Sequence, residues 1–253
     1  MYTIREDTEF GLDMVRGLPR VWHCVKTETP HQILCKPGLV EMYREFTDNV
    51  VVNKSWHPNN PDDLYGIERP EWTMDMWNPP PLKEMYKDKI EFDKPTIVIN
   101  NKFISELSLN KVNETLGKYP SIDLSMGAMI EDDTFCSINH YSMEFIDKLV
   151  KKYSDKFKII YISPIVSDSY FKDHQKMIRV NDYEYLEENH PEVYTIKQHM
   201  KNRNISYNIA QFELEASSEK HLSLLGGNCK VSSYFGGDVI IYLSDMWKYG
   251  SPV

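Results

Sequence analysis

Two glycine pairs near the carboxyl end of the chain are the residues best suited to chemistry. The apolar run Leu222 to Leu225 leads into Gly226-Gly227-Asn228, and a short segment that we expect to be helical follows. The second pair, Gly236-Gly237, leads into another apolar run, Val239 to Leu243. A glycine pair at the end of a strand lets backbone N–H groups approach a ligand closely, because glycine lacks a Cβ. A helix that begins there directs its free N–H groups at an anion. The pattern favours binding of a nucleotide diphosphate, with two tight turns in an α/β sheet as the alternative.

Several polar groups are candidates to complete such an anion site. Lys102 follows the predicted strand Thr96 to Asn100, at the sheet edge where ligands of open α/β sheets bind. It is our candidate cation, and an ordinary surface lysine is the alternative. The other donors would be backbone amides and hydroxyls of the predicted helix, for which helix capping is the alternative role: Gly226, Gly227, Asn228, Ser232 and Ser233.

Three further residues are candidates for contact with a nucleotide, each with a structural alternative. Gln211 would face a cleft from a predicted helix, although surface amides are common. Arg179 would pair bidentately with phosphate, and a surface salt bridge is its alternative. Tyr161 would border a pocket for the base unless it packs in the core.

Strand and helix signals alternate over residues 95–253. Short β-branched runs predict buried strands at Thr96 to Asn100, Lys158 to Ile162 and Val193 to Ile196, and two more strands flank the glycine pairs. Asn181 and Glu184 form a predicted capping box, and Ser206 is a predicted helix cap. Helical spacing of apolar residues lies between the strands. This alternation predicts an α/β fold with a Rossmann-like parallel sheet and helices on both faces.

The first part of the chain predicts a smaller unit, residues 1–94. Apolar runs at Val21 to Val25 and Val50 to Val52 flank a segment with helical spacing, which is typical of a reduced second α/β lobe. From Ser55 to Lys94 the chain is rich in proline and tryptophan and poor in glycine. Such a composition predicts a stiff connection whose tryptophans pack on a domain or line a binding surface.

Composition and charge exclude several classes of protein. The chain has 253 residues and a net charge of −9, so no general attraction to nucleic acid is expected. No apolar run approaches the roughly 20 residues that a membrane span needs, and the charged N-terminus does not resemble a signal peptide. The four cysteines lie far apart. We therefore expect buried thiols and a cytoplasmic setting, which would be the host cytoplasm if the protein is viral.

Motifs in the C-terminal part of the chain resemble a known family. They are INNK (99–102), FIDKLVKKYSDKFKIIYISP (145–164), DYEYLEENHPEV (182–193), NIAQFELEA (208–216) and LLGGNCKVSSYFGG (224–237). The pattern is similar to small glycosyltransferases of bacteria and large algal DNA viruses, a family that includes a xylosyltransferase. The resemblance implies a GT-B-type lobe that holds a nucleotide-sugar donor, with a UDP-sugar favoured and xylose the first sugar to test. The acceptor would be an oligosaccharide or a glycoprotein. Enzymes of this type have two full lobes, so the N-terminal lobe here would be abbreviated.

Sugar transfer needs a base for the acceptor hydroxyl and a stabilised leaving diphosphate. Asp75 is our candidate base, because it lies between Trp72 and Trp77, whose rings could stack on sugars; a packed linker is the alternative. Asp13 and His57 are the other candidates. The chain has no strict Asp-x-Asp motif of the kind that holds a metal against a diphosphate, so we expect inverting, metal-independent transfer.

Two other functions remain open from the sequence. The small size of the chain also fits a non-catalytic nucleotide-sugar-binding module or partner subunit. A dinucleotide or S-adenosylmethionine enzyme would place a glycine-rich loop after its first strand, whereas Asn100-Asn101-Lys102 follows the Thr96 strand here.

Overall fold

The fold is described from a computed structural model. It describes residues 2–6, 13–52, 77–103, 107–108, 129–131, 135–137, 139–165 and 180–243.

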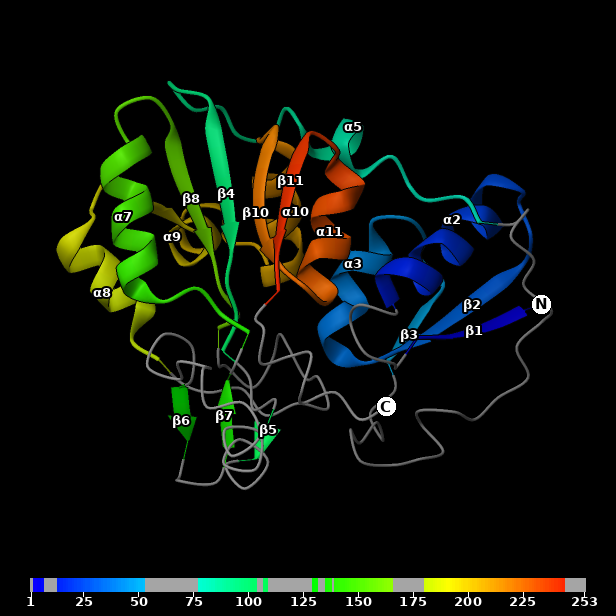
Figure 1. The fold of residues 1–253 in the computed structure, drawn as a ribbon. Coiled ribbons are helices and arrows are strands. Elements are labelled where there is room, and N and C mark those ends of the chain that lie inside the picture. Colours follow the sequence, from blue (N-terminus) through cyan, green and yellow to red (C-terminus); the bar gives the residue numbers. More distant parts are fainter. Residues whose placement is uncertain are drawn as a thin grey trace.

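A five-stranded parallel sheet forms the centre of the C-terminal part (Figure 1). Its strand order is β11-β10-β4-β8-β9, and every neighbouring pair is parallel. All five residues of β4 are buried, as expected for a strand covered on both faces. The predicted α/β fold with a Rossmann-like parallel sheet is confirmed. The strands are β4 (Thr96–Asn100), β8 (Lys158–Ile162), β9 (Tyr194–Thr195), β10 (Lys220–Leu224) and β11 (Asp238–Tyr242).

Helices cover both faces of this sheet, with α7 in front of it and α9 and α10 behind it in Figure 1. The helices are α7 (Met143–Tyr153), α8 (Asp182–Asn189), α9 (Ile196–Arg203), α10 (Tyr207–Ala216) and α11 (Gly227–Phe235).

The predicted helix caps are only partly correct. Asn181 and Ser206 occupy the N-cap positions of α8 and α10, but neither side chain makes a capping hydrogen bond, so the capping box predicted at Asn181 is wrong. A capping box forms instead at α9, where Thr195 accepts a hydrogen bond from the Gln198 amide and Gln198 accepts one from the Thr195 amide. Ser206 and Thr195 both have extended backbone angles, so neither the residue type nor the backbone conformation alone tells which side chain makes the capping bond.

The N-terminal part has its own parallel sheet, of order β1-β2-β3. The expected reduced α/β lobe is therefore present, and the apolar run Val21 to Val25 lies in a helix of it. A third, antiparallel sheet has the order β5-β7-β6. The elements are β1 (Tyr2–Glu6), η1 (Asp13–Gly17), α2 (Leu18–Lys26), β2 (His31–Cys35), η2 (Pro37–Leu39), α3 (Val40–Arg44), β3 (Val50–Val52), α5 (Leu82–Tyr86), β5 (Leu107–Ser108), β6 (Met129–Glu131) and β7 (Phe135–Ser137).

Helix α10 belongs to the cores of both parallel sheets, and all ten of its residues are buried. Tyr207, Ala210 and Leu214 pack with the five-stranded sheet. Ile209 and Phe212 pack with residues of the N-terminal lobe, α5 and α11. Each fully buried apolar side chain contributes roughly 1.5–3 kcal/mol. Residues before and after position 94 therefore both contribute to the core that includes Ile209 and Phe212.

Candidate functional site

The strand order places a topological switch point between β4 and β10. The chain leaves β4 for β8 on one side, whereas β10 pairs with the other side of β4. Ligands of open parallel sheets bind in the crevice at the carboxyl ends of the strands at such a point. Asn100 pairs in register with Ser223, so the segments that follow, Asn101-Lys102 and Leu225-Gly226, leave the sheet at the same level.

Gly226 forms the turn between β10 and helix α11. Its φ of 132° and ψ of −151° lie in a region that is essentially restricted to glycine. The Lys102 ammonium nitrogen lies 3.4 Å from the position that a Cβ on Gly226 would occupy. The free amides of the first turn of α11 therefore open beside a cation, so the end of the helix dipole and the ammonium charge favour an anion together. The structure brings together Lys102, Gly226 and Gly227, as the sequence predicted.

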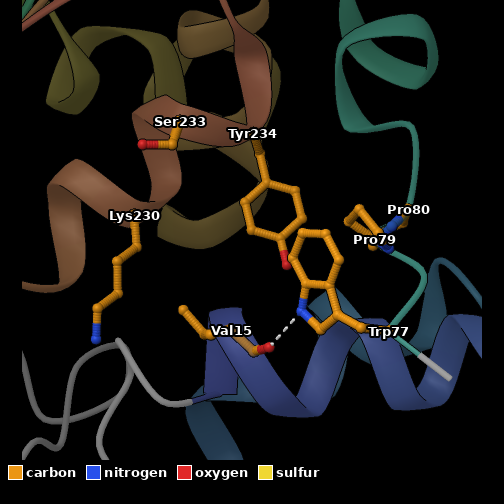
Figure 2. Close-up of a pocket in the computed structure, with 7 residues that line it drawn as sticks. All are labelled: Val15, Trp77, Pro79, Pro80, Lys230, Ser233 and Tyr234. Atoms are coloured by element: carbon orange, nitrogen blue, oxygen red, sulfur yellow. Dashed lines mark hydrogen bonds between the residues drawn. The ribbon is translucent and has the colours of Figure 1, made fainter. Parts of the chain in front are cut away.

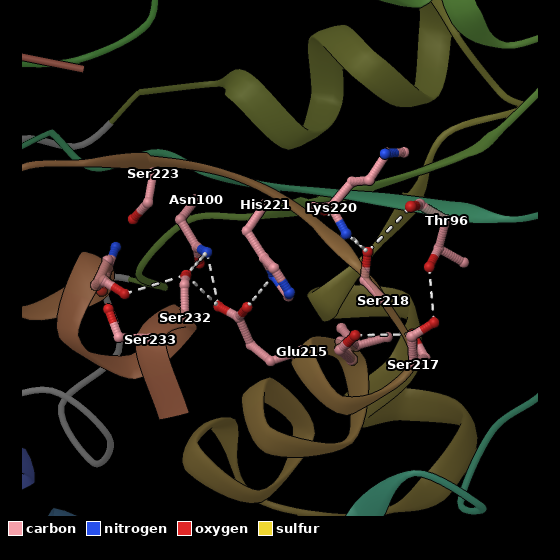
Figure 3. A network of polar contacts seen from close by, with 12 residues as sticks. Thr96, Asn100, Glu215, Ser217, Ser218, Lys220, His221, Ser223, Ser232 and Ser233 are labelled. Atoms are coloured by element: carbon pink, nitrogen blue, oxygen red, sulfur yellow. Dashed lines mark hydrogen bonds and ion pairs between the residues drawn. The ribbon is translucent and has the colours of Figure 1, made fainter. Parts of the chain in front are cut away.

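A buried polar cluster connects α10 and α11 to the strands β4 and β10 (Figure 3). Glu215 of α10 is fully buried, and its Oε1 accepts hydrogen bonds from Asn100 Nδ2 at 2.6 Å and from Ser232 Oγ at 3.3 Å. Its Oε2 lies 2.7 Å from Nδ1 of the buried His221. Asn100 Nδ2 also contacts Ser232 Oγ at 3.1 Å. The cluster joins β4, β10, α10 and α11 and so fixes the glycine turn relative to the sheet edge.

Asn228 is the first-turn residue whose side chain the cluster does not satisfy. It is 7% exposed, and its Nδ2 is buried without a hydrogen-bond partner among the residues that the structure describes. A buried amide donor without a partner costs about 1–3 kcal/mol. An anion bound at this end of α11 would offset that cost if it accepted a hydrogen bond from Asn228 Nδ2.

Asn101 holds the backbone of Lys102 in place. Its Oδ1 accepts hydrogen bonds from the amides of Tyr141 at 2.8 Å and Lys102 at 3.1 Å. Its Nδ2 donates to the Tyr141 carbonyl and to the Tyr161 hydroxyl, both at 3.0 Å. The Tyr161 hydroxyl in turn donates to Asp182 Oδ2 at 2.9 Å. Burial raises the pKa of Tyr161 well above its ordinary value, and burial also raises the pKa of the Asp182 carboxyl.

Three predicted donor contacts do not agree with the structure. Tyr161 has no exposed surface and supports Asn101 from the core, so it does not border a pocket for the base. Gln211 is completely buried within α10 and does not face a cleft. The Ser232 hydroxyl is also fully buried, and its single proton lies between two acceptors, Glu215 Oε1 and the Asn228 carbonyl oxygen, each 3.3 Å from Oγ. Gln211 and Ser232 are buried because α10 and α11 pack against several elements, which helical periodicity alone does not report. Tyr161 is buried because β8 is an inner strand of the sheet.

A pocket of about 300 Å³ lies along the outer face of α11 (Figure 2). It is bounded by η1 and by the segment that precedes α5. Trp77 Nε1 donates to the Val15 carbonyl at 3.0 Å, and the Tyr234 hydroxyl donates to the Met14 carbonyl. Ser233, the last of the predicted donors, lies here rather than at the glycine turn, and its hydroxyl donates to the Cys229 carbonyl at 2.7 Å. The lining residues are Val15, Trp77, Pro79, Pro80, Lys230, Ser233 and Tyr234.

Three predicted site residues lie outside the described residues: the candidate base Asp75, its alternative His57, and the candidate phosphate ligand Arg179. Asp13 is the first residue of η1, two positions before the pocket residue Val15. Asn100 and Asn101 are the site residues that sequence reasoning missed. The available signal was the pair of side-chain amides, Asn100 and Asn101, at the end of an apolar strand. Polar side chains in such a buried position need hydrogen-bond partners, which indicates a polar cluster there.

Comparisons with known proteins found no match for this chain among protein-family models, curated proteins or solved structures. Within the described ranges, no helix is long and apolar enough to cross a membrane. The same ranges contain no group of three or more histidine, cysteine, aspartate or glutamate side chains placed to hold a metal ion.

Proposed function

We propose that this protein is a glycosyltransferase that binds a nucleotide-sugar, with a UDP-sugar favoured, at the switch point between β4 and β10. The observation that carries the proposal is the Lys102 ammonium, 3.4 Å from the Cβ position of Gly226, at the N-terminus of α11. A diphosphate would accept hydrogen bonds from the first-turn amides and pair with Lys102. Charge-assisted hydrogen bonds of this kind are about twice as strong as neutral ones.

The proposed reaction is an inverting transfer. The acceptor hydroxyl oxygen forms a bond to the anomeric carbon of the sugar while the bond from that carbon to the diphosphate oxygen breaks. The electron pair of the broken bond leaves with the diphosphate, whose charge Lys102 and the amides of α11 stabilise. The hydroxyl proton passes to a carboxylate, for which Asp75 remains our candidate because it precedes the pocket residue Trp77 by two positions in the chain. Xylose is the first sugar to test.

The shared core supports a second candidate, a nucleotide-sugar-binding module without transfer activity. Helix α10 packs against both sheets, which restrains the lobes from closing over a substrate by a hinge motion. Closure of that kind completes many transferase sites and excludes water from them. Lobes that do not close would still bind the donor at the switch point, without completing a site for transfer.

Calorimetric titration with UDP, UDP-xylose, UDP-glucose and GDP tests donor binding. Lys102→Gln removes the ammonium, and we expect it to weaken UDP binding roughly tenfold or more, as for loss of a hydrogen bond to a charged group. Lys102→Arg retains the charge and should recover part of the affinity. Lys148→Gln is the matched control, because Lys148 is an exposed lysine of α7 paired only with Glu144 in the described structure.

The outcomes separate the two candidates. Donor binding together with transfer to an acceptor, or with donor hydrolysis, supports the enzyme. Donor binding with neither reaction supports the binding module. If none of the nucleotides binds, or if Lys102→Gln binds them as well as the unmodified protein does, the proposed site is wrong.

A further inference from the structure

The pocket and the glycine turn lie along the same face of α11. Gly227, Lys230 and Tyr234 follow one another at intervals of three and four residues, and all three are partly exposed. The buried face of the same helix carries Asn228, Val231 and Phe235. A helix rises about 1.5 Å per residue, so the pocket begins roughly 5 Å along the helix from the turn. A molecule in the pocket therefore lies beside a donor whose diphosphate occupies the turn.

The walls of the pocket are held in place before any ligand arrives. Trp77 is 44% exposed, yet its indole N–H is anchored to the Val15 carbonyl, so the ring keeps one orientation (Figure 2). Pro79 and Pro80 restrict the chain that follows it. The Tyr234 hydroxyl is tied to η1. The aromatic side chains of the pocket are therefore held in position before a ligand binds. Binding then does not have to pay the conformational entropy of ordering them.

Lys230 supplies the charge of the pocket. Its side chain has no hydrogen bond or ion pair with any part of the chain that the structure describes. Lys83, Lys197 and Lys220, by contrast, each pair with a carboxylate. A lysine in a largely apolar pocket is complementary to an anion that the described residues do not provide.

We propose that this pocket binds the acceptor and that the acceptor ends in an anionic sugar, one that bears a carboxylate or a phosphate. This inference rests on the proposed function, because the acceptor hydroxyl must reach a donor held at Gly226. The sugar ring would stack on Trp77, its anionic group would pair with Lys230, and a ring hydroxyl would donate to Ser233 Oγ. A volume of about 300 Å³ is at the small end of ligand pockets and suits a single ring.

A matched set of small glycosides tests the inference on the full chain. Methyl glucuronide and methyl glucoside differ in one substituent, a carboxylate or a hydroxymethyl group, and glucose 6-phosphate supplies the phosphate form. We expect an anionic sugar to bind about tenfold more tightly than the glucoside, as for one hydrogen bond to a charged group. The stronger of the two anionic sugars identifies the carboxylate or the phosphate as the recognised group.

Four variants assign the contacts. Lys230→Gln should abolish the preference for the anionic sugar and leave weak binding of the glucoside, while Lys230→Arg should retain the preference. Trp77→Leu should weaken binding of every glycoside. Lys148→Gln should bind like the unmodified protein. Lys230→Gln should still bind UDP, which also shows that this variant is folded.

The result distinguishes this inference from the proposed function. If UDP binds and no glycoside does, or if Lys230→Gln keeps the anionic preference, the acceptor assignment is wrong and the donor site stands. If UDP displaces the glycoside, the pocket belongs to the donor and the acceptor assignment is also wrong. If the anionic glycoside binds and no nucleotide does, the pocket binds anionic sugars but the proposed transfer is wrong.

Discussion

Replacement of Gly226 by alanine tests the anion site through the backbone itself. The φ of 132° and ψ of −151° at this position cost a residue with a Cβ about 1–3 kcal/mol, so we expect the free energy of unfolding to fall by that amount. The added methyl would lie 3.4 Å from Lys102 Nζ, an ordinary contact, so the strain is in the backbone angles and not in a collision. The methyl would, however, lie against the ammonium that we propose as the partner of the diphosphate.

We expect this methyl to separate the diphosphate from Lys102 and so to lower the affinity for the donor. One hydrogen bond from an amide to a charged phosphate contributes roughly 1.5–3 kcal/mol, so Gly226→Ala should weaken UDP binding about tenfold to a hundredfold. Urea unfolding measures the stability, and calorimetric titration at a temperature where the variant is folded measures the affinity.

The other end of the same helix offers a matched control. Gly236 has a φ of 69° and a ψ of −161°, and a Cβ there would meet nothing within 4 Å. Gly236→Ala should therefore lose a similar amount of stability while UDP binding stays unchanged. Equal UDP affinities for the two variants, or normal binding by Gly226→Ala, would refute the assignment of the phosphate to this turn.

Three further predictions concern the structure that holds the site. Thr195→Ala should lower the free energy of unfolding by about 1 kcal/mol, since it removes the cap formed with Gln198, and Thr195→Ser should restore it, as measured by urea unfolding. Phe212→Ala should cost roughly 3–5 kcal/mol and reduce UDP affinity, because this fully buried ring joins α10 to the N-terminal lobe; Phe212→Leu should cost less. Burial lowers the pKa of His199 below 6.5 despite its hydrogen bond to Glu213 at 2.8 Å, so the unfolded chain takes up the proton more readily. Stability should therefore decrease as the pH falls through 6.5, and His199→Gln should flatten that part of the dependence; an unchanged slope would contradict this.

Local patterns in the sequence were sufficient for most of the elements around the site. The β-branched run at Thr96 to Asn100, the strand at Lys158 to Ile162 and the glycine turn at Gly226 all have the predicted conformation. Each depends on a property that a short segment carries by itself, such as side-chain branching or the absence of a Cβ. The meeting of Lys102 and Gly226 was also predictable, because parallel strands end at the same edge of a sheet.

The partners of the buried polar groups were decided by the tertiary structure. Asn100 bonds to Glu215, 115 positions away, and Trp77 bonds to Val15, 62 positions away. Helical periodicity indicates which side of a helix is apolar, but α10 is buried on every side, so Gln211, which was predicted to face a cleft, lies in the core. The sequence alone thus determined the strands, the glycine turn and the edge where they end. Only packing determined which side chains remain exposed there, because burial depends on neighbours that are distant in the chain.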